Sequence, residues 1–139
     1  MIILDAEVLS ALMRQTPAKK NVVVRLDKQP RTSVWTSSVT IMELRFGLQV
    51  IPLGKRRSLL IRAFDAVLDK VGYRVAPFDA AAAQQAGDLM ASRQKKGRPG
   101  DLRDTMIAGI VLVHHATLAT RNMTHFEDLS VPVINPWLA

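Results

Sequence analysis

Met1-Ile2-Ile3-Leu4-Asp5 opens the sequence with a short apolar run that stops at an acidic residue. A run of β-branched and apolar residues is typical of a strand buried on both faces, and the acid indicates that this strand ends at a polar site. We interpret four later stretches as strands, and Pro132 restricts the last of them to a sheet edge. These stretches are residues 33–37, 73–76, 117–120 and 131–134.

Apolar residues at helical spacing separate the expected strands. The clearest case runs from Leu59 to Val71, where apolar residues recur every three or four positions until Gly72 ends the helix. Asp79 is expected to cap an alanine-rich helix that reaches Arg93. The alternation predicts an α/β sandwich with a mostly parallel sheet of about five strands, in which ligands gather at the carboxyl ends. The other helices are expected at residues 8–14, around 22–26, at 40–50 and at 102–113.

The composition fits one domain spanning residues 1–139, because a chain of this length usually builds a single core. The absence of cysteine excludes disulfides and thiolate metal sites, and it fits a reducing cytoplasm. The longest apolar stretch, Met106 to Val113, is much shorter than a membrane span, and the N-terminus lacks the features of a signal peptide. We therefore expect a cytoplasmic protein that does not cross a membrane.

The net charge of +7, from 19 Lys and Arg against 12 Asp and Glu, favours a phosphate polyanion or an acidic protein as partner. A basic protein without such a partner is the alternative, because net charge says nothing about fold. The basic run from Arg93 to Arg98, which enters the loop at residues 95–100, is interpreted either as an RNA contact or as a solvated loop. Charge alone also suggests a DNA-binding regulator, but the sequence has no helix-turn-helix or ribbon motif.

Polar residues follow several of the expected strands, where a parallel sheet would bring them to one edge. Asp5 follows the first strand, Glu43 lies in the helix after the second, Asp104 opens the late helix, and Asn122 follows the fourth strand. Three carboxylates and an amide are hard oxygen donors, which suit Mg²⁺ or Mn²⁺ and argue against zinc. The sequence thus predicts a divalent metal site at this edge.

The acids also have structural interpretations. Glu43 follows Thr40 in the T-x-x-E pattern of a capping box, in which the glutamate bonds a backbone amide. Asp101 and Asp104 both lie at the start of one helix, where acids are favoured. Capping therefore explains at least one of these two acids. For Asp5 the structural interpretation is the weakest, because a carboxylate that ends an apolar strand would be costly to bury without a partner.

Histidines are secondary candidates. His114 and His115 end a helix, where such side chains typically satisfy the last carbonyls rather than bind metal. His125 lies just beyond the fourth polar block and could face the site, although Asn122 is the stronger candidate.

Five blocks of the sequence resemble PIN-domain ribonucleases of the VapC/FitB toxin type. They occur in the order found in that family and cover nearly the whole chain. The blocks are Met1–Asp5, Ser38–Gly47, Asp104–Ile110, Thr117–Phe126 and Val133–Trp137.

The resemblance implies a PIN-like three-layer sandwich and a metal-dependent endoribonuclease that serves as the toxin of a toxin-antitoxin pair. Asp5, Glu43 and Asp104 would be its metal-binding acids, which leaves Asp101 as the helix cap. Asn122 matches the fourth site position, where the family has Asp or Asn. The resemblance also implies an RNA substrate, with tRNA as one candidate, a cognate antitoxin that covers the site, and a homodimer.

Two residues beside the first acid depart from the family pattern. Thr and Asn usually follow that acid, whereas this chain has Ala6 and Glu7. If residues 5–7 are extended, Glu7 points the same way as Asp5, and if a helix starts at once, Glu7 lies in its first turn and faces away from the metal. Either geometry leaves open a second function, a catalytically weakened module that binds RNA or a protein partner.

Overall fold

The computed structural model describes residues 1–14, 17 and 19–138, and in this part of the chain it forms an α/β sandwich around a parallel sheet. The strand order is β3-β2-β1-β4-β5, and all four neighbouring pairs are parallel. The strands are β1 (Ile2–Leu4), β2 (Val34–Ser37), β3 (Val75–Ala76), β4 (Thr117–Ala119) and β5 (Val133–Ile134). The predicted class and strand number are confirmed, and β5 lies at an edge, as Pro132 requires.

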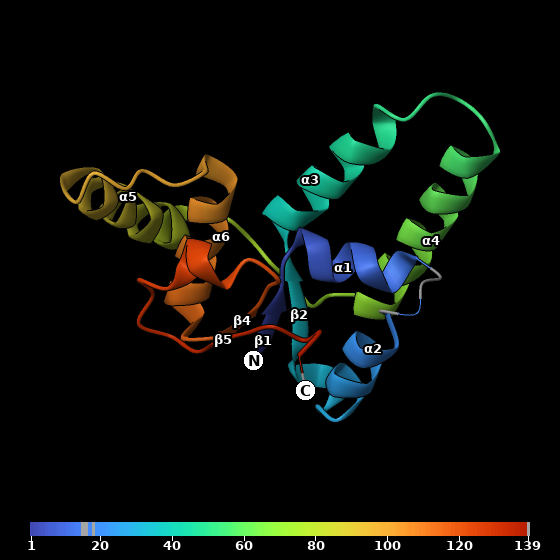
Figure 1. Ribbon diagram of the computed structural model, residues 1–139, viewed down its shortest axis with the longest axis horizontal. Helices are drawn as coiled ribbons and strands as arrows, with labels where there is room; N and C mark the ends of the chain where they lie inside the picture. The colour runs from blue at the N-terminus through green and yellow to red at the C-terminus, as the bar shows by residue number, and fades with distance from the viewer. Residues whose placement is uncertain (15–16, 18, 139) are drawn as a thin grey trace.

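Helices cover both faces of the sheet (Figure 1). One side carries α5 (Ala80–Lys95) and α6 (Leu102–His114), and the other carries α1 (Ala6–Met13), α2 (Lys19–Asp27) and α4 (Lys55–Val71). Helix α3 (Ser38–Gln49) extends from the end of β2 and is joined to α4 by a loop. Two short 3-10 turns, η1 (Arg31–Ser33) and η2 (Met123–Phe126), complete the fold.

Alternating strand residues separate two main hydrophobic clusters. Ile3 and Leu118 pack with buried residues of α5 and α6, whereas Ile2 and Leu4 pack with α1 and α2. Because successive strand side chains point to opposite faces, one short strand contributes to both clusters. Phe64 is buried in a third cluster between α3 and α4. The sheet edge that carries the predicted acids is thus supported by packing on both sides.

Helix α6 approaches α5 closely because Gly109 has no side chain. A Cβ at Gly109 would collide with the carbonyl oxygen of Ala82 and would lie 2.9 Å from the Cβ of Ala86. The contact fixes α6 against α5, and Asp104 lies in the first turn of α6. Small residues at one crossing therefore help to set the position of a predicted site acid.

Several helices begin earlier than the apolar pattern predicts, and at two of them a polar cap precedes the first apolar residue. Asp5 caps α1, so this helix starts at Ala6 instead of at residue 8. Ser37 caps α3, which starts at Ser38 instead of at residue 40. Helix α4 extends to Lys55, four residues before the predicted start, whereas Gly72 and Asp79 end and cap their helices as predicted. Among the described residues, no helix has the length and apolar character needed to cross a membrane.

Candidate active site

Asp5 lies at the end of β1 and is almost fully buried, with 7% of its surface exposed. Its Oδ1 atom accepts a hydrogen bond of 3.1 Å from the Val8 amide, so the side chain caps α1. Burial raises the pKa of Asp5 to about 6, hydrogen bonds from Thr120 and Val8 oppose this, and the charges of Glu7 and Asp104 add to it. The capping bond gives Asp5 a structural role that the sequence did not suggest.

Glu43 lies in the second turn of α3 and does not form the capping box that the T-x-x-E pattern suggested. The cap is Ser37, whose Oγ accepts from the Thr40 amide at 3.1 Å, and this leaves Glu43 outside the cap. Burial raises the pKa of Glu43, Arg103 opposes this change, and Asp104 adds to it. Its Oε2 atom lies 4.0 Å from Nη1 of Arg103, and its Oε1 atom is buried without a hydrogen-bond partner in the described structure.

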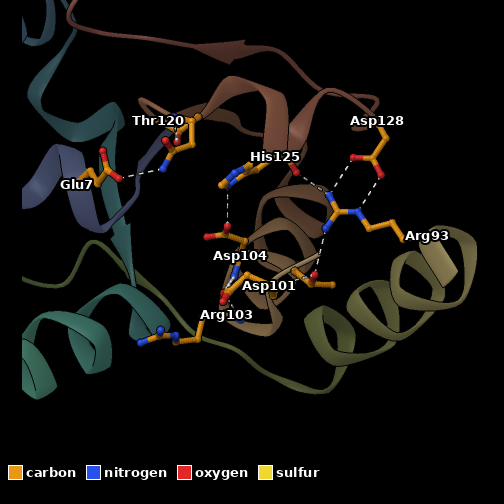
Figure 2. A network of polar contacts seen from close by, with 10 residues as sticks. Glu7, Arg93, Asp101, Arg103, Asp104, Thr120, His125 and Asp128 are labelled. Carbon is orange, nitrogen blue, oxygen red and sulfur yellow. Dashed lines mark hydrogen bonds and ion pairs between the residues drawn. The ribbon is translucent and has the colours of Figure 1, made fainter. Parts of the chain in front are cut away.

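At the start of α6, Asp101 is the helix cap, as predicted, and Asp104 is not. Asp101 Oδ1 accepts from the amides of Arg103 at 2.9 Å and Asp104 at 3.1 Å, so Asp101 is the cap. Asp104 Oδ2 is free of the cap and lies 3.1 Å from Nδ1 of His125 (Figure 2). Burial raises the pKa of Asp104, the charge of Asp101 adds to this, and the hydrogen bond with His125 opposes it. His125 therefore does face the site.

Asn122 contacts Glu7, and this contact corrects one prediction. Helix α1 starts at Ala6, which places Glu7 in the first turn, where it was expected to face away from the site. Instead, Nδ2 of Asn122 donates to Oε1 of Glu7 at 2.9 Å. The charge of Glu7 also contributes to the raised pKa of Asp5. The first turn of α1 thus brings Glu7 to the edge of the site, because the loop after β4 folds over it.

The chemistry of the donors at this site suits a divalent metal. Burial raises the pKa values of Asp5, Glu43 and Asp104, and the charge of Asp104 adds to the rise at the other two. Glu43 also has one unpartnered buried oxygen, as expected where a cation would compensate the acids. As the side chains stand, the described residues contain no group of three acids or histidines close enough to hold one ion. The carboxylates would have to rotate to share it.

His114 and His115 lie at the opposite end of α6 from Asp104. Both are exposed, and His115 ends the helix with a left-handed backbone conformation, φ 48°. Their position at the helix end is as predicted. They take no part in the site.

Arg93 is the functional neighbour that the sequence did not reveal, because it lies at the start of a basic run that suggested a solvated loop. It is 5% exposed and makes a bidentate pair with Asp128, with distances of 2.8 and 2.9 Å. Its remaining donors bond Thr105 Oγ1 and the carbonyl oxygen of His125, each at 3.0 Å (Figure 2). Arg93 therefore connects α5 to both elements that carry the Asp104–His125 contact.

The raised pKa of Asp5 predicts a pH-dependent stability of the metal-free chain. A raised pKa means that the folded state binds the proton more tightly, so stability is complete below 3.8 and is lost as pH rises through about 6. Asp5→Asn retains the side-chain cap of α1, and it does not lose stability in this pH window because asparagine has no carboxylate to ionise. We expect its free energy of unfolding, relative to that of the unmodified chain, to rise by about 3 kcal/mol across this window. Urea unfolding in EDTA from pH 3 to 8 measures the difference, and a constant difference would contradict the prediction.

Comparisons with known proteins point to one family. A family model described as the PIN domain matches residues 2–130. The chain is 36% identical over 138 residues to the "VapC ribonuclease Y4jK" of Sinorhizobium fredii, covering 99% of this chain and 98% of that one. It is 31% identical to the "Toxin FitB" of Neisseria gonorrhoeae, covering 99% of both chains. It is 35% identical to the "tRNA(fMet)-specific endonuclease VapC" of Shigella flexneri, covering 66% of this chain and 65% of that one.

The solved structures give the same result. A chain in the crystal structure of FitAcB from Neisseria gonorrhoeae superposes with a TM-score of 0.89 at 31% identity, and the match covers 100% of both chains. The family model covers nearly the whole chain, and so do two relatives that are more than 30% identical to it. The chain therefore belongs to the PIN-domain family.

Proposed function

We propose that this chain is the toxin of a toxin-antitoxin pair and that it hydrolyses RNA phosphodiesters with Mg²⁺ or Mn²⁺. The observation that carries the proposal is the group of Asp5, Glu43 and Asp104 at the carboxyl edge of the sheet, with raised pKa values and one unpartnered oxygen. The names of the relatives, which include a VapC ribonuclease and a tRNA endonuclease, support the same activity.

Each site residue has a distinct task in this proposal. Asp5 and Asp104 would hold the ion directly, and Glu43 would hold it directly or through water. When bound, a divalent ion neutralises the phosphate and lowers the pKa of a water molecule that attacks phosphorus. His125 contacts Oδ2 of Asp104, which leaves Oδ1 of that carboxylate to hold the ion. Asn122 would orient the substrate with the donor and acceptor positions that its bond to Glu7 leaves free.

A protein partner is the second part of the proposal. Met42, Phe46 and Val50 on or next to α3 expose 50, 61 and 64% of their surface, and Leu53 in the following loop exposes 88%. Large apolar side chains exposed together favour a protein contact. We propose a cognate antitoxin as partner, with the toxin acting in the cytoplasm as a homodimer of single-domain chains.

The alternative function is a weakened PIN module that binds RNA or a partner without cutting. One observation favours it: Glu7 holds the amide of Asn122 and adds negative charge beside Asp5. One assay separates the two functions. Only the enzyme shortens an RNA, and it does so only when a metal is present.

The purified chain is expected to cleave RNA in the presence of Mg²⁺ or Mn²⁺ and to lose this activity in EDTA, because the site offers only hard oxygen donors and one imidazole. The assay follows a labelled tRNA pool and an unstructured RNA by gel, with Ca²⁺ as a further control. Cleavage that continues in EDTA would contradict the proposed mechanism. Binding without cleavage under every metal would favour the alternative module.

A further inference from the structure

A second hollow lies beside the proposed metal site and has no role in the proposed function so far. Its volume is about 480 Å³, and its lining includes Ala6, Glu7 and Arg14 from the α1 region and Arg121 and Trp137 from the C-terminal part of the chain. A larger hollow of about 830 Å³ is lined by Asp104 on the other side of the site, and it shares no lining residue with the smaller one. Glu7 connects the smaller hollow to the site, because it bonds Asn122.

Arg121 lies over the ring of Trp137 in this hollow, and the outer face of its guanidinium forms what we call the Arg121–Trp137 surface. The guanidinium carbon of Arg121 lies 4.8 Å from the centre of the Trp137 ring, so the two planar groups are in contact. Trp137 is held in place by packing against the cluster of β1, α1 and α2, and its amide donates to Oδ1 of Asn135 at 3.0 Å. Aromatic rings and guanidinium planes are the surfaces on which unpaired RNA bases stack.

Glu7 supplies the hydrogen-bonding edge of the hollow. An ionised carboxylate only accepts hydrogen bonds and has about four acceptor positions, so the bond from Asn122 leaves most of them available. Guanine is the base with two adjacent donors, N1–H and N2–H₂, on its Watson–Crick edge, and it can bond a carboxylate at both oxygens. Ala6 leaves the space beside Glu7 unfilled by a larger side chain.

The charge of the hollow suits a nucleic acid despite the glutamate. Arg14 and Arg121 contribute two positive charges to the lining against the one negative charge of Glu7. Arg14 also donates from Nε to Oγ of Ser10 at 3.3 Å, which keeps it along α1. Phosphates that flank a bound base would therefore meet cations on the same wall.

We propose that this hollow is a specificity subsite that binds one unpaired guanine of the RNA substrate, stacked on the Arg121–Trp137 surface and recognised by Glu7. The inference rests on the proposed function, because it assigns a base to the same substrate. It also gives a role to the two residues that depart from the family pattern: Ala6 opens the subsite and Glu7 selects the base.

The test measures RNA binding separately from cleavage. Asp5→Asn, which retains the cap of α1, serves as the background in EDTA, and fluorescence anisotropy follows four uridine-rich 9-mers that differ only in a central G, A, C or U. We expect the G oligonucleotide to bind about tenfold more tightly than the other three. Glu7→Gln keeps an acceptor for Asn122 but loses the second acceptor oxygen, and it should reduce the preference to less than about twofold.

Two exposed residues of α4 provide matched controls. Asp65→Asn removes one negative charge and Arg62→Gln one positive charge away from the hollow, and both should retain the guanine preference. Arg121→Gln should weaken binding of all four oligonucleotides through lost stacking and charge. Equal binding of the four oligonucleotides, a preference that survives Glu7→Gln, or no binding at all would overturn the subsite.

Cleavage-site mapping with the unmodified chain distinguishes the two proposals. Metal-dependent cleavage with guanine at a fixed distance from the cut supports both proposals. Metal-dependent cleavage without a guanine preference refutes the subsite and leaves the nuclease function standing. Guanine-selective binding without cleavage under any metal supports the subsite and refutes the nuclease function.

Discussion

Asp5→Asn and Asp104→Asn are each expected to lower metal-dependent RNA cleavage by more than about 100-fold. Each change removes one negative charge and one oxygen donor from a site that has few of either. Neither should unfold the chain, because asparagine can accept the Val8 amide bond at position 5 and Asp101 remains the cap of α6. Single-turnover cleavage of one labelled RNA at saturating metal measures the loss.

The matched control for these variants is Asp88→Asn, which removes one carboxylate from the exposed surface of α5. It should cleave at the rate of the unmodified chain. Thermal unfolding without metal provides the second readout, and the site variants should unfold at the same temperature or higher because like charges no longer crowd. Variants that unfold would show that the acids are structural, and variants that cleave normally would remove them from the site.

Arg93→Met is expected to lower the free energy of unfolding by about 2 to 3 kcal/mol, a loss limited by the exposure of Asp128, whose carboxylate water can solvate. Arg93 is buried and bonds Asp128, Thr105 and the backbone of His125, so its loss leaves a carboxylate and a carbonyl without their partner. The guanidinium bonds hold the pKa of Asp128 below its usual range. Urea unfolding at pH 7 measures the effect.

Two further variants distinguish the contribution of the Arg93–Asp128 pair to the free energy of unfolding from the general effect of removing an arginine. Arg98→Met removes an exposed arginine whose contact with Glu127 is 3.7 Å long, and it should change stability by less than about 1 kcal/mol. Arg93→Met combined with Asp128→Leu should recover part of the loss, because no charge is left unpaired. A loss below about 1 kcal/mol in Arg93→Met alone would show that the Arg93–Asp128 pair contributes little.

The sheet and its polar edge were predictable because they follow from local patterns. Asp5 comes directly after an apolar strand and Asn122 three residues after another, and parallel pairing brings such residues to one edge. Asp101 could be separated from Asp104 through the family resemblance, and its place before the first helical turn is that of a cap.

The remaining features depend on contacts between distant parts of the chain. Arg93 and Asp128 are 35 residues apart, and no local pattern in a basic run indicates that one arginine turns inward. The bond from Asn122 to Glu7 spans 115 residues, so the sequence could list two positions for Glu7 but could not choose its partner. The cap at Ser37 was missed because Thr40 and Glu43 matched a motif whose cap lies three residues later than the real one.

The binding of Mn²⁺ to the chain without RNA tests most directly whether the acids at the end of the sheet hold a metal. Isothermal titration at pH 7.5 is expected to detect a site in the unmodified protein that is at least about tenfold weaker in Asp5→Asn and in Asp104→Asn, and unchanged in Asp88→Asn. Binding should also weaken as pH falls through about 6, because Asp5 must lose its proton to hold the ion. Equal Mn²⁺ affinity in all four proteins would contradict the account, since the acids at the end of the sheet would not then be the metal ligands.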